Sequence, residues 1–280
     1  MFKIVEKELL NPTVVRMVID APLVARKAQP GQFIILRTNA DGERIPLTVA
    51  DYDRETGTVT IIFQIVGATT EKLGHMAVGE SLSDFVGPLG RATETEGLRK
   101  VAVIGGGVGC AIAYPVAKKL HEQGTEVHAI VGFRNKDLVI LEKEFAAASS
   151  LLKVMTDDGS YGEQGLVTTA LKALIDGGEQ YDEVIAIGPL PMMKFVSLLT
   201  KEYGIKTVVS MNPIMIDGTG MCGGCRLTVD GETKFACVDG PEFDGHLVDF
   251  DEAMTRGGMY KVFERYAHEE TCRLFQKEVQ

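Results

Sequence analysis

The stretch Val101-Ala-Val-Ile-Gly-Gly-Gly-Val-Gly109 decides how this chain of 280 residues folds. A short apolar run, typical of a buried strand, leads directly into a glycine-rich turn, and a helix-compatible segment follows as far as Gly124. Strand, turn and helix in this order begin a βαβ unit of a parallel sheet. Backbone N–H groups at such a turn favour the pyrophosphate of a dinucleotide. The predicted contacts are Gly105, Gly106, Gly107 and Gly109.

The glycine turn is incomplete as a dinucleotide fingerprint, because Ile112 stands where the third spaced glycine belongs. A tight strand-to-helix connection without a ligand therefore remains an alternative. Further along, strand-like runs at 127–131 and 184–187 alternate with helix-compatible segments around 137–149, 165–176 and 190–203. This alternation predicts an α/β nucleotide-binding domain over residues 98–209. Gly188 and Pro189 follow one of its strands, at the end where open α/β sheets bind ligands.

Residues 1–97 have a different pattern, in which short β-rich runs such as 13–19, 32–37 and 58–66 are separated by turn residues. This pattern predicts an antiparallel β-barrel. Two motifs in this region are candidate flavin-binding residues. The first consists of Arg44, Pro46, Leu47 and Thr48, in which the arginine can pair with a phosphate and the threonine hydroxyl can hydrogen-bond a flavin ring. Gly67, Thr69 and Thr70 form the second. A surface arginine and an ordinary turn are the alternatives.

The third part of the chain, residues 210–248, contains Asp217-Gly-Thr-Gly-Met-Cys222-Gly-Gly-Cys225 and then Cys237. With Asp217 as a ligand, the spacing D-x4-C-x2-C-x11-C is that of a plant-type [2Fe–2S] site with its first thiolate replaced by a carboxylate. The glycines let the backbone approach the inorganic core. A Cys3Asp zinc site and a disulfide are the alternatives. The spacing predicts a small [2Fe–2S] module held by Asp217, Cys222, Cys225 and Cys237.

Composition limits the partners that this chain can have. A net charge of -10 argues against nucleic acid, which needs clustered Lys and Arg. The sequence has no apolar run of membrane-spanning length and no charged-then-apolar start, so we expect no membrane segment and a cytoplasmic location. The remaining residues, 249–280, are polar and helix-compatible, and we expect them to form a C-terminal helical tail. Cys110 and Cys272 lack partners at metal-ligand spacing, so we interpret them as a core residue and a tail residue.

Taken in order, the two barrel motifs, the turn Gly87-Pro-Leu-Gly90, the glycine turn, Gly188-Pro-Leu-Pro-Met-Met193 and the cluster loop resemble the ferredoxin–NADP reductase superfamily. Within it they are most similar to the branch of the dihydroorotate dehydrogenase B electron-transfer subunits. The resemblance implies an FAD in the barrel, NAD(H) on the α/β domain and a [2Fe–2S] cluster leading to a partner. It also implies that Arg44 contacts the FAD phosphates and Thr48 the ring.

Two departures refine the resemblance. Asp217 stands where the dihydroorotate subunits carry a fourth cysteine, and the chain continues well past the last ligand to Gln280. Both features are similar to the small subunits of NADH-dependent reduced ferredoxin:NADP oxidoreductases. That likeness implies electron bifurcation in a heterodimer with a larger subunit that carries flavin and [4Fe–4S] clusters, and contact with ferredoxin through that subunit.

Two other functions stay open at this point. The chain could serve a dihydroorotate dehydrogenase catalytic subunit, or it could hold flavin and cluster as a redox-sensing module without turnover. The preferred nucleotide is also open, because Arg134 follows the second strand of the α/β domain, where an acid would bind the 2′-hydroxyl of NAD. An arginine there could accept the 2′-phosphate of NADP, whereas the resemblance implies NAD(H).

Overall fold

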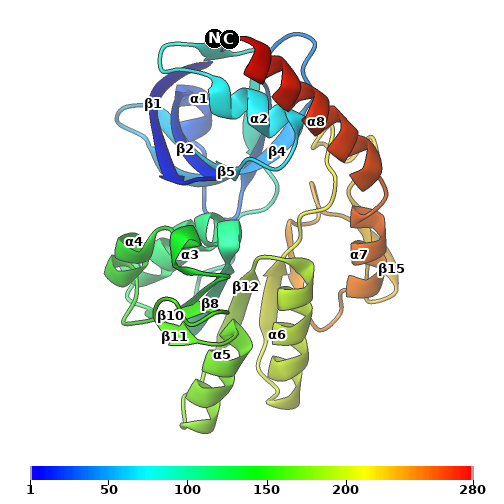
Figure 1. The fold of residues 1–280 in the computed structure, drawn as a ribbon. Helices are drawn as coiled ribbons and strands as arrows, with labels where there is room; N and C mark the ends of the chain where they lie inside the picture. Colours follow the sequence, from blue (N-terminus) through cyan, green and yellow to red (C-terminus); the bar gives the residue numbers. More distant parts are fainter. Residues whose placement is uncertain (1, 279–280) are drawn as a thin grey trace.

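A computed structural model describes the backbone of residues 2–278 and the side-chain surroundings of residues 2–272. The first part of the chain is a seven-stranded antiparallel sheet in the order β6-β1-β2-β5-β4-β3-β7, which curls into the predicted barrel (Figure 1). Its strands are β1 (Phe2–Asn11), β2 (Val14–Asp20), β3 (Phe33–Arg37), β4 (Ile45–Asp53), β5 (Thr58–Gln64), β6 (Ser81–Leu82) and β7 (Asp84–Leu89). Alternate residues of β2, namely Val15, Met17 and Ile19, are buried in its core, as the two-residue period of a strand requires.

A second seven-stranded sheet follows in the order β11-β10-β9-β8-β12-β13-β16. All of its pairings are parallel except that of β13 with β16. The strands are β8 (Lys100–Gly106), β9 (Glu126–Phe133), β10 (Leu151–Thr156), β11 (Glu163–Gln164), β12 (Glu183–Ile187), β13 (Thr207–Ser210) and β16 (Glu242–Asp244). The helical segments are η1 (Gly107–Gly109), α3 (Cys110–Glu122), η2 (Lys136–Leu138), α4 (Glu142–Ala147), α5 (Val167–Asp176) and α6 (Leu190–Glu202). The predicted mixture of barrel and α/β sheet is confirmed.

The surroundings of strand β8 explain why its residues 101–104 are all apolar and do not alternate with polar ones. Ala102 and Ile104 point to one hydrophobic cluster, whereas Val101 and Val103 point to another, and all four are fully buried. A parallel sheet covered by helices on both faces demands such a run. Strand β8 lies between β9 and β12, where the order of strands reverses direction, and ligands bind at such a switch point beyond the carboxyl ends of the strands.

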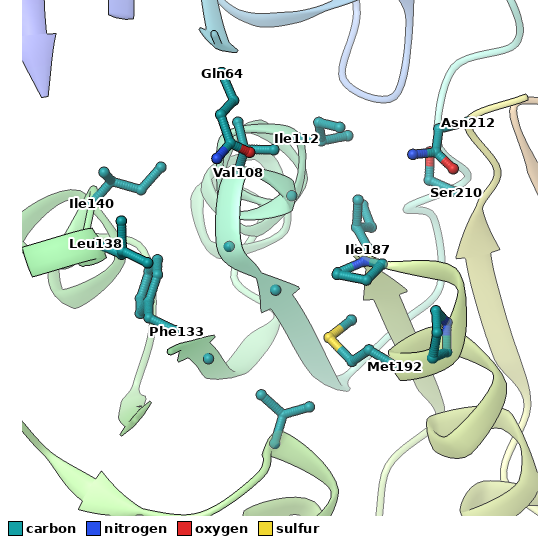
Figure 2. A pocket seen from close by; sticks show the side chains of 18 of the residues that line it. Gln64, Val108, Ile112, Phe133, Leu138, Ile140, Ile187, Met192, Ser210 and Asn212 are labelled. Carbon is teal, nitrogen blue, oxygen red and sulfur yellow. The ribbon is translucent and has the colours of Figure 1, made fainter. Parts of the chain in front are cut away.

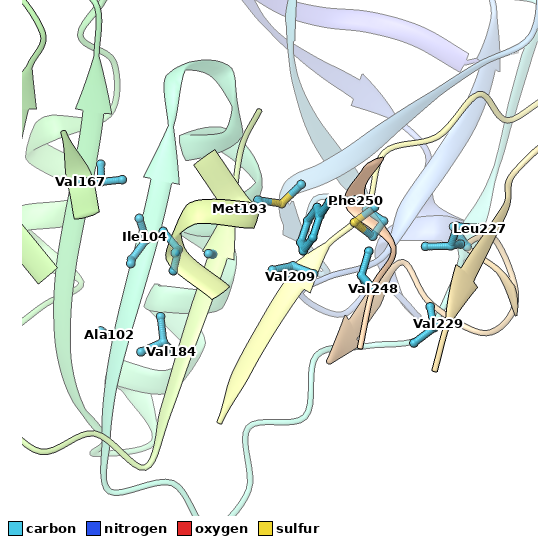
Figure 3. Close-up of a cluster of buried hydrophobic side chains, with 14 of the residues drawn as sticks. Ala102, Ile104, Val167, Val184, Met193, Val209, Leu227, Val229, Val248 and Phe250 are labelled. Carbon is cyan, nitrogen blue, oxygen red and sulfur yellow. The ribbon is translucent and has the colours of Figure 1, made fainter. Parts of the chain in front are cut away.

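The cysteine-containing part contains a two-stranded sheet of β14 (Arg226–Val229) and β15 (Glu232–Phe235), followed by β16 and α7 (Phe250–Gly257). Its apolar side chains do not form a separate core. Leu227, Val229 and Phe250 belong to the same hydrophobic cluster as Ile104 and Val184 of the parallel sheet (Figure 3). Because β16 also pairs with β13, this part is anchored in the parallel sheet. The domain boundaries 1–97, 98–209, 210–248 and 249–280 remain proposals.

The tail returns to the barrel. After α7, helix α8 (Lys261–Glu278) runs back beside α2 (Ala68–His75), a barrel helix that the β-rich pattern of residues 1–97 did not predict (Figure 1). A single-turn helix, α1 (Pro22–Ala25), was also not predicted. Residues 279–280 of the predicted tail lie outside the described residues. Over the described part of the chain, none of the helices has the length and apolar character needed to cross a bilayer.

Candidate cofactor site

A cavity of about 1490 Å³ lies between the barrel and the carboxyl ends of the parallel strands. Side chains from both sheets surround it, including Gln64 of β5, Ile187 of β12 and Asn212 after β13 (Figure 2). Nine of the residues predicted from sequence line it: Pro46, Leu47, Thr48, Thr70, Gly106, Gly107, Gly109, Gly188 and Pro189. The barrel motif at 46–48 and the pair Gly188 and Pro189, which lie about 140 residues apart in the sequence, therefore line the same cavity.

The glycine turn is shaped by close contact with the neighbouring strand end. A Cβ atom at Gly106 would lie 2.5 Å from Met192 Sδ and 3.0 Å from Pro189 Cδ. A Cβ atom at Gly109 would lie 2.5 Å from the carbonyl oxygen of Ile187. The backbone contact at Gly109 leaves no room for a side chain, and at Gly106 Met192 and Pro189 would have to move aside, so these glycines let the ends of β8 and β12 lie close together. The backbone is thereby exposed to the cavity, as a pyrophosphate site requires.

Gly107 serves a different purpose. Its φ angle is +54°, and a Cβ atom there would meet nothing within 4 Å. The position therefore borders open space in the cavity, where a side chain would occupy the volume of a ligand. Gly105 does not line the cavity; it is the last residue but one of β8, and a Cβ atom there would lie 2.7 Å from Cys110 Sγ. Its requirement for glycine comes from packing under the turn.

The barrel contributes the start of β4 and the start of α2. Thr48 pairs with Phe33 across the barrel sheet and is half-buried at the cavity wall. Thr70 Oγ1 accepts hydrogen bonds from the backbone N–H groups of Val66 and Gly67, both at 3.0 Å, and so fixes the first turn of α2. That turn lines the cavity through Thr70, and the amino end of a helix favours anions.

Three predicted flavin residues lie outside the cavity lining. Arg44 is exposed just before β4, Gly67 is the N-cap of α2, and Thr69 is buried. Thr69 Oγ1 donates a 2.6 Å hydrogen bond to Glu43 Oε2, which places the segment preceding β4 against the first turn of α2. Arg44 therefore lies near the amino end of α2, and the positive charge and the helix end would both attract a phosphate.

The predicted cluster loop is organised around the carboxylate of Asp217. Asp217 Oδ2 accepts a 3.1 Å hydrogen bond from the backbone N–H of Cys222, and Oδ1 accepts hydrogen bonds from the hydroxyl and the N–H of Thr219. Those from the Thr219 hydroxyl and the Cys222 amide are the main causes that lower the pKa of Asp217 to about 2. The side chain is therefore ionised at any physiological pH, as an iron ligand must be.

The three cysteines of the loop form one close pair and one separate thiol. Cys225 Sγ and Cys237 Sγ are 3.2 Å apart and buried, whereas Cys222 is exposed at the rim of the loop. Burial, followed by the neighbouring Cys225 thiol, raises the pKa of Cys237 to about 12. Two buried thiols this close ionise together only when a metal compensates their charge. The donor set of one carboxylate and three thiols fits a [2Fe–2S] cluster.

The loop contacts the barrel next to the point where it leaves the cavity wall. A Cβ atom at Gly218, whose φ is +77°, would lie 2.8 Å from both Ile35 Cδ1 and Leu89 Cδ1. Met215, two residues before Asp217, lines the cavity. The segment that carries the first predicted iron ligand therefore leaves directly from the cavity wall.

Several polar lining residues were not predicted from the sequence. Ser210 ends β13, Asn212 follows that strand, and Gln64 ends β5. The general rule that ligands bind beyond the carboxyl ends of parallel strands would have indicated Ser210 and Asn212, had the short strand before them been recognised. No sequence signal marked Gln64, because its place at the cavity depends on how the barrel docks on the second sheet.

Comparison with known proteins supports the iron–sulfur module. Residues 212–249 match the family model of the iron–sulfur cluster binding domain of dihydroorotate dehydrogenase B. That range includes all four predicted ligands. The module predicted from the spacing is therefore confirmed, while the role of each ligand stays a prediction.

Relatives match almost the whole chain. A homologue of the dihydroorotate dehydrogenase B (NAD(+)) electron transfer subunit from Thermotoga maritima is 46% identical over 95% of this chain and 94% of its own length. The corresponding subunit of Streptococcus pneumoniae is 33% identical over 86% of this chain and 94% of its own length. A solved structure described as an NADH-dependent reduced ferredoxin-NADP oxidoreductase, studied for flavin-based electron bifurcation, superposes with a TM-score of 0.92. It is 43% identical and covers 96% of this chain and 97% of that chain.

Proposed function

The chain belongs to the family of the dihydroorotate dehydrogenase B electron-transfer subunits and their homologues, and from that premise we propose what it does. It is an oxidoreductase subunit that passes electrons between NAD(H), FAD and a [2Fe–2S] cluster, to or from a larger subunit. The observation that carries this proposal is that one cavity is lined by the barrel motif, by the glycine turn and by the segment leading into the cluster loop. Cofactors held at these three places lie within one continuous path.

Flavin would occupy the barrel side of the cavity. Thr48 offers its hydroxyl at the wall, while Pro46 and Leu47 present apolar surface to a ring. The first turn of α2, with Arg44 nearby, supplies N–H groups and positive charge for the phosphates. Bound FAD would connect the nicotinamide with the cluster, since a flavin exchanges electrons in pairs with nicotinamide and singly with a cluster.

The nicotinamide nucleotide would lie across the switch point. Gly106, Gly107 and Gly109 expose backbone N–H groups for its pyrophosphate, and Gly188 with Pro189 forms the opposite wall. Arg134 and Asp157 also line the cavity, beyond β9 and β10. The arginine can pair with a 2′-phosphate and the aspartate with a ribose hydroxyl, so the site suits both NADP and NAD. The Thermotoga relative, a homologue of an NAD(+) electron transfer subunit, favours NAD(H).

The iron ligands would be Asp217, Cys222, Cys225 and Cys237. The close pair Cys225 and Cys237 suits one iron, and Asp217 with Cys222, which share a hydrogen bond, suits the other. Glycines with positive φ at 218, 220 and 223 keep the loop narrow enough for backbone N–H groups to reach the sulfides. The exposed edge at Cys222 provides the exit for single electrons.

The partner would be a larger flavin- and [4Fe–4S]-containing subunit, through which ferredoxin is reached, and the reaction would be electron-bifurcating NADH-dependent ferredoxin:NADP oxidoreduction. The solved structure at 43% identity supports this choice. The surface around the cluster loop suits a subunit interface, because Met221 is 88% exposed beside Cys222 and the tail adds exposed apolar side chains at Met259, Tyr260 and Phe263. Arg256 of α7 donates a hydrogen bond to the carbonyl of Gly224, which joins the two regions.

The decisive experiment is anaerobic purification from the native host, identification of co-purified chains by mass spectrometry, and reduction of the complex with NADH. We expect a larger subunit with flavin and [4Fe–4S] motifs, and bleaching of flavin and cluster absorption on addition of NADH. Co-purification of a dihydroorotate dehydrogenase chain, with reduction by dihydroorotate, would place the protein with the other members of the family model. A flavin that neither NADH nor NADPH reduces would indicate a redox-sensing module instead.

A further inference from the structure

Three metal-binding side chains meet between the barrel and the tail, remote in sequence from the cluster loop. They are Glu71 of α2 and His268 and Cys272 of α8, and their ligand atoms all lie within 4.8 Å of one another. His268 and Cys272 are four residues apart on one helix, so both side chains face the same direction. Each of the three residues is partly buried. No role in flavin, nucleotide or cluster binding accounts for them.

The carboxylate of Glu71 is held from both sides. Its Oε1 lies 3.1 Å from His75 Nε2, one helical turn along α2, and its Oε2 lies 3.3 Å from His268 Nε2 across the interface. The side chain of Glu71 is 19% exposed and that of His268 is 31% exposed. The group is therefore ordered by its neighbours but still reachable from solvent, which is what an ion needs to enter.

We propose that Glu71, His268 and Cys272 bind a zinc-class divalent cation, which fastens α8 to the barrel. Imidazole, thiolate and carboxylate are together the donors of Zn²⁺, whereas Mg²⁺ and Ca²⁺ prefer oxygen ligands alone. Bonds of roughly 2.0–2.3 Å place tetrahedral ligand atoms roughly 3.3–3.8 Å apart, so the trio needs only a small contraction to close on an ion.

His75 has a defined place in this site. It already contacts the Glu71 oxygen that does not face His268, and a second partner of that kind orients a ligating carboxylate and tunes its affinity. Water or another small ligand would complete the coordination. The ion would do no redox chemistry; its effect would be to join the end of the chain to the domain proposed to hold FAD.

The first test measures zinc binding by the full-length protein, purified anaerobically with its iron and sulfide in place. We expect one Zn²⁺ per chain by calorimetric titration, and at least tenfold weaker binding in His268→Ala and in Cys272→Ser. His121→Ala, which removes an exposed histidine on α3, is the matched control and should bind zinc normally. Absence of zinc binding, or equal binding by all four proteins, would overturn the proposal.

X-ray absorption at the zinc edge separates this site from the cluster loop. Zinc at the proposed site has one sulfur neighbour at about 2.3 Å and nitrogen or oxygen neighbours at about 2.0–2.2 Å. Zinc misincorporated at the cluster loop would have three sulfur neighbours, and that spectrum would refute the assignment even if the stoichiometry were correct.

The fastening role has its own readout in hydrogen exchange. With zinc bound, backbone amides of residues 261–272 should exchange more slowly than in zinc-free protein, and this difference should vanish in His268→Ala. Exchange that is unaffected by zinc in the parent protein would show that the ion, although bound, does not hold the helix. Visible absorption of the cluster, recorded alongside, verifies that added zinc has not displaced iron.

Discussion

Asp217 has two structural tasks in one side chain. Its carboxylate fixes the loop through Thr219 and Cys222, and the same carboxylate is the proposed fourth iron ligand. Because both tasks use oxygen atoms, substitutions can separate them. Asparagine keeps an oxygen that accepts hydrogen bonds but loses the negative charge, whereas alanine loses both.

For Asp217→Asn we expect the iron and sulfide content of the anaerobically purified protein to fall by roughly tenfold or more, since even the loss of a supporting partner of a metal ligand has an effect of that size. Asp217→Cys should keep the cluster with a changed visible spectrum, because a thiolate has the same charge. Iron and sulfide analysis with visible spectroscopy gives the answer. Full occupancy in both Asp217→Asn and Asp217→Ala would show that Asp217 is not a ligand.

A second residue-scale prediction concerns Gly107. Gly107→Ala should lower the free energy of unfolding by about 1–2 kcal/mol, because an L-residue at φ +54° is strained, and should weaken NADH binding at least about tenfold, because its Cβ enters the cavity. Gly124→Ala is the control: its φ is +87°, its Cβ meets nothing within 4 Å, and it lies outside the cavity. It should show the strain without the loss of binding, measured by NADH titration of FAD-loaded protein. Equal NADH affinity in the two variants would remove Gly107 from the site.

At the scale of elements, the sequence predicted β8, β9 and β12 of the parallel sheet, missed the short strand β13, and predicted none of the barrel helices. Strand β8 was recognisable because burial on both faces leaves only apolar residues in it. Helix α2 was missed because its residues, Ala68–His75, are mostly polar, and the helix is stabilised by a cap and by contact with α8 rather than by a periodic apolar face.

The candidate site, like the fold, could be predicted from the sequence only in part. The glycine turns and the cluster ligands have fixed local spacing, so the sequence could indicate them. Gln64 and the trio Glu71, His268 and Cys272 are brought into place only by packing between distant segments. No local pattern indicates such an arrangement, and only the three-dimensional structure reveals it.

The first turn of α8 carries a prediction about assembly. Phe263 is 73% exposed near other apolar side chains, an arrangement that is typical of an interface. Phe263→Ser should weaken binding of the larger subunit at least about tenfold. Leu23→Ser, which changes a barrel residue that is 72% exposed, should leave assembly unaffected. Size-exclusion chromatography of the reconstituted complex, with bound flavin measured in parallel, compares them. An intact complex with Phe263→Ser would locate the interface elsewhere.

At the scale of the whole molecule, Glu242 marks the place where three parts meet. It lies in β16, accepts a 2.7 Å hydrogen bond from Thr93 Oγ1 in the link between the two sheets, and lies close to Gly31 of the barrel. Burial, together with the nearby carboxylates of Glu183 and Glu94, raises the pKa of Glu242 from 4.5 to about 7. The junction therefore contains an acid that titrates near neutrality.

Because the folded state raises this pKa, it binds the proton more tightly than the unfolded chain does. The stabilisation is complete below pH 4.5 and is lost as the pH rises through about 7, by up to about 3 kcal/mol. Glu242→Gln mimics the protonated acid, so its free energy of unfolding should decline less between pH 5 and pH 8. Urea unfolding at several pH values measures the difference, with Glu232→Gln, an exposed site, as the control. Parallel pH profiles for Glu242→Gln and the parent protein would contradict the assignment.

The pairing of β13 with β16 has a consequence for how the protein matures. The cluster loop leaves the sheet after Ser210 and returns at Glu242, and these two residues are partners in the same ladder. Both ends of the loop are therefore held by the folded sheet, and its side chains Leu227 and Val229 pack in the hydrophobic cluster of that sheet. We therefore expect the apoprotein to fold before it receives its cluster, so that the machinery that delivers iron and sulfide acts on a structured protein.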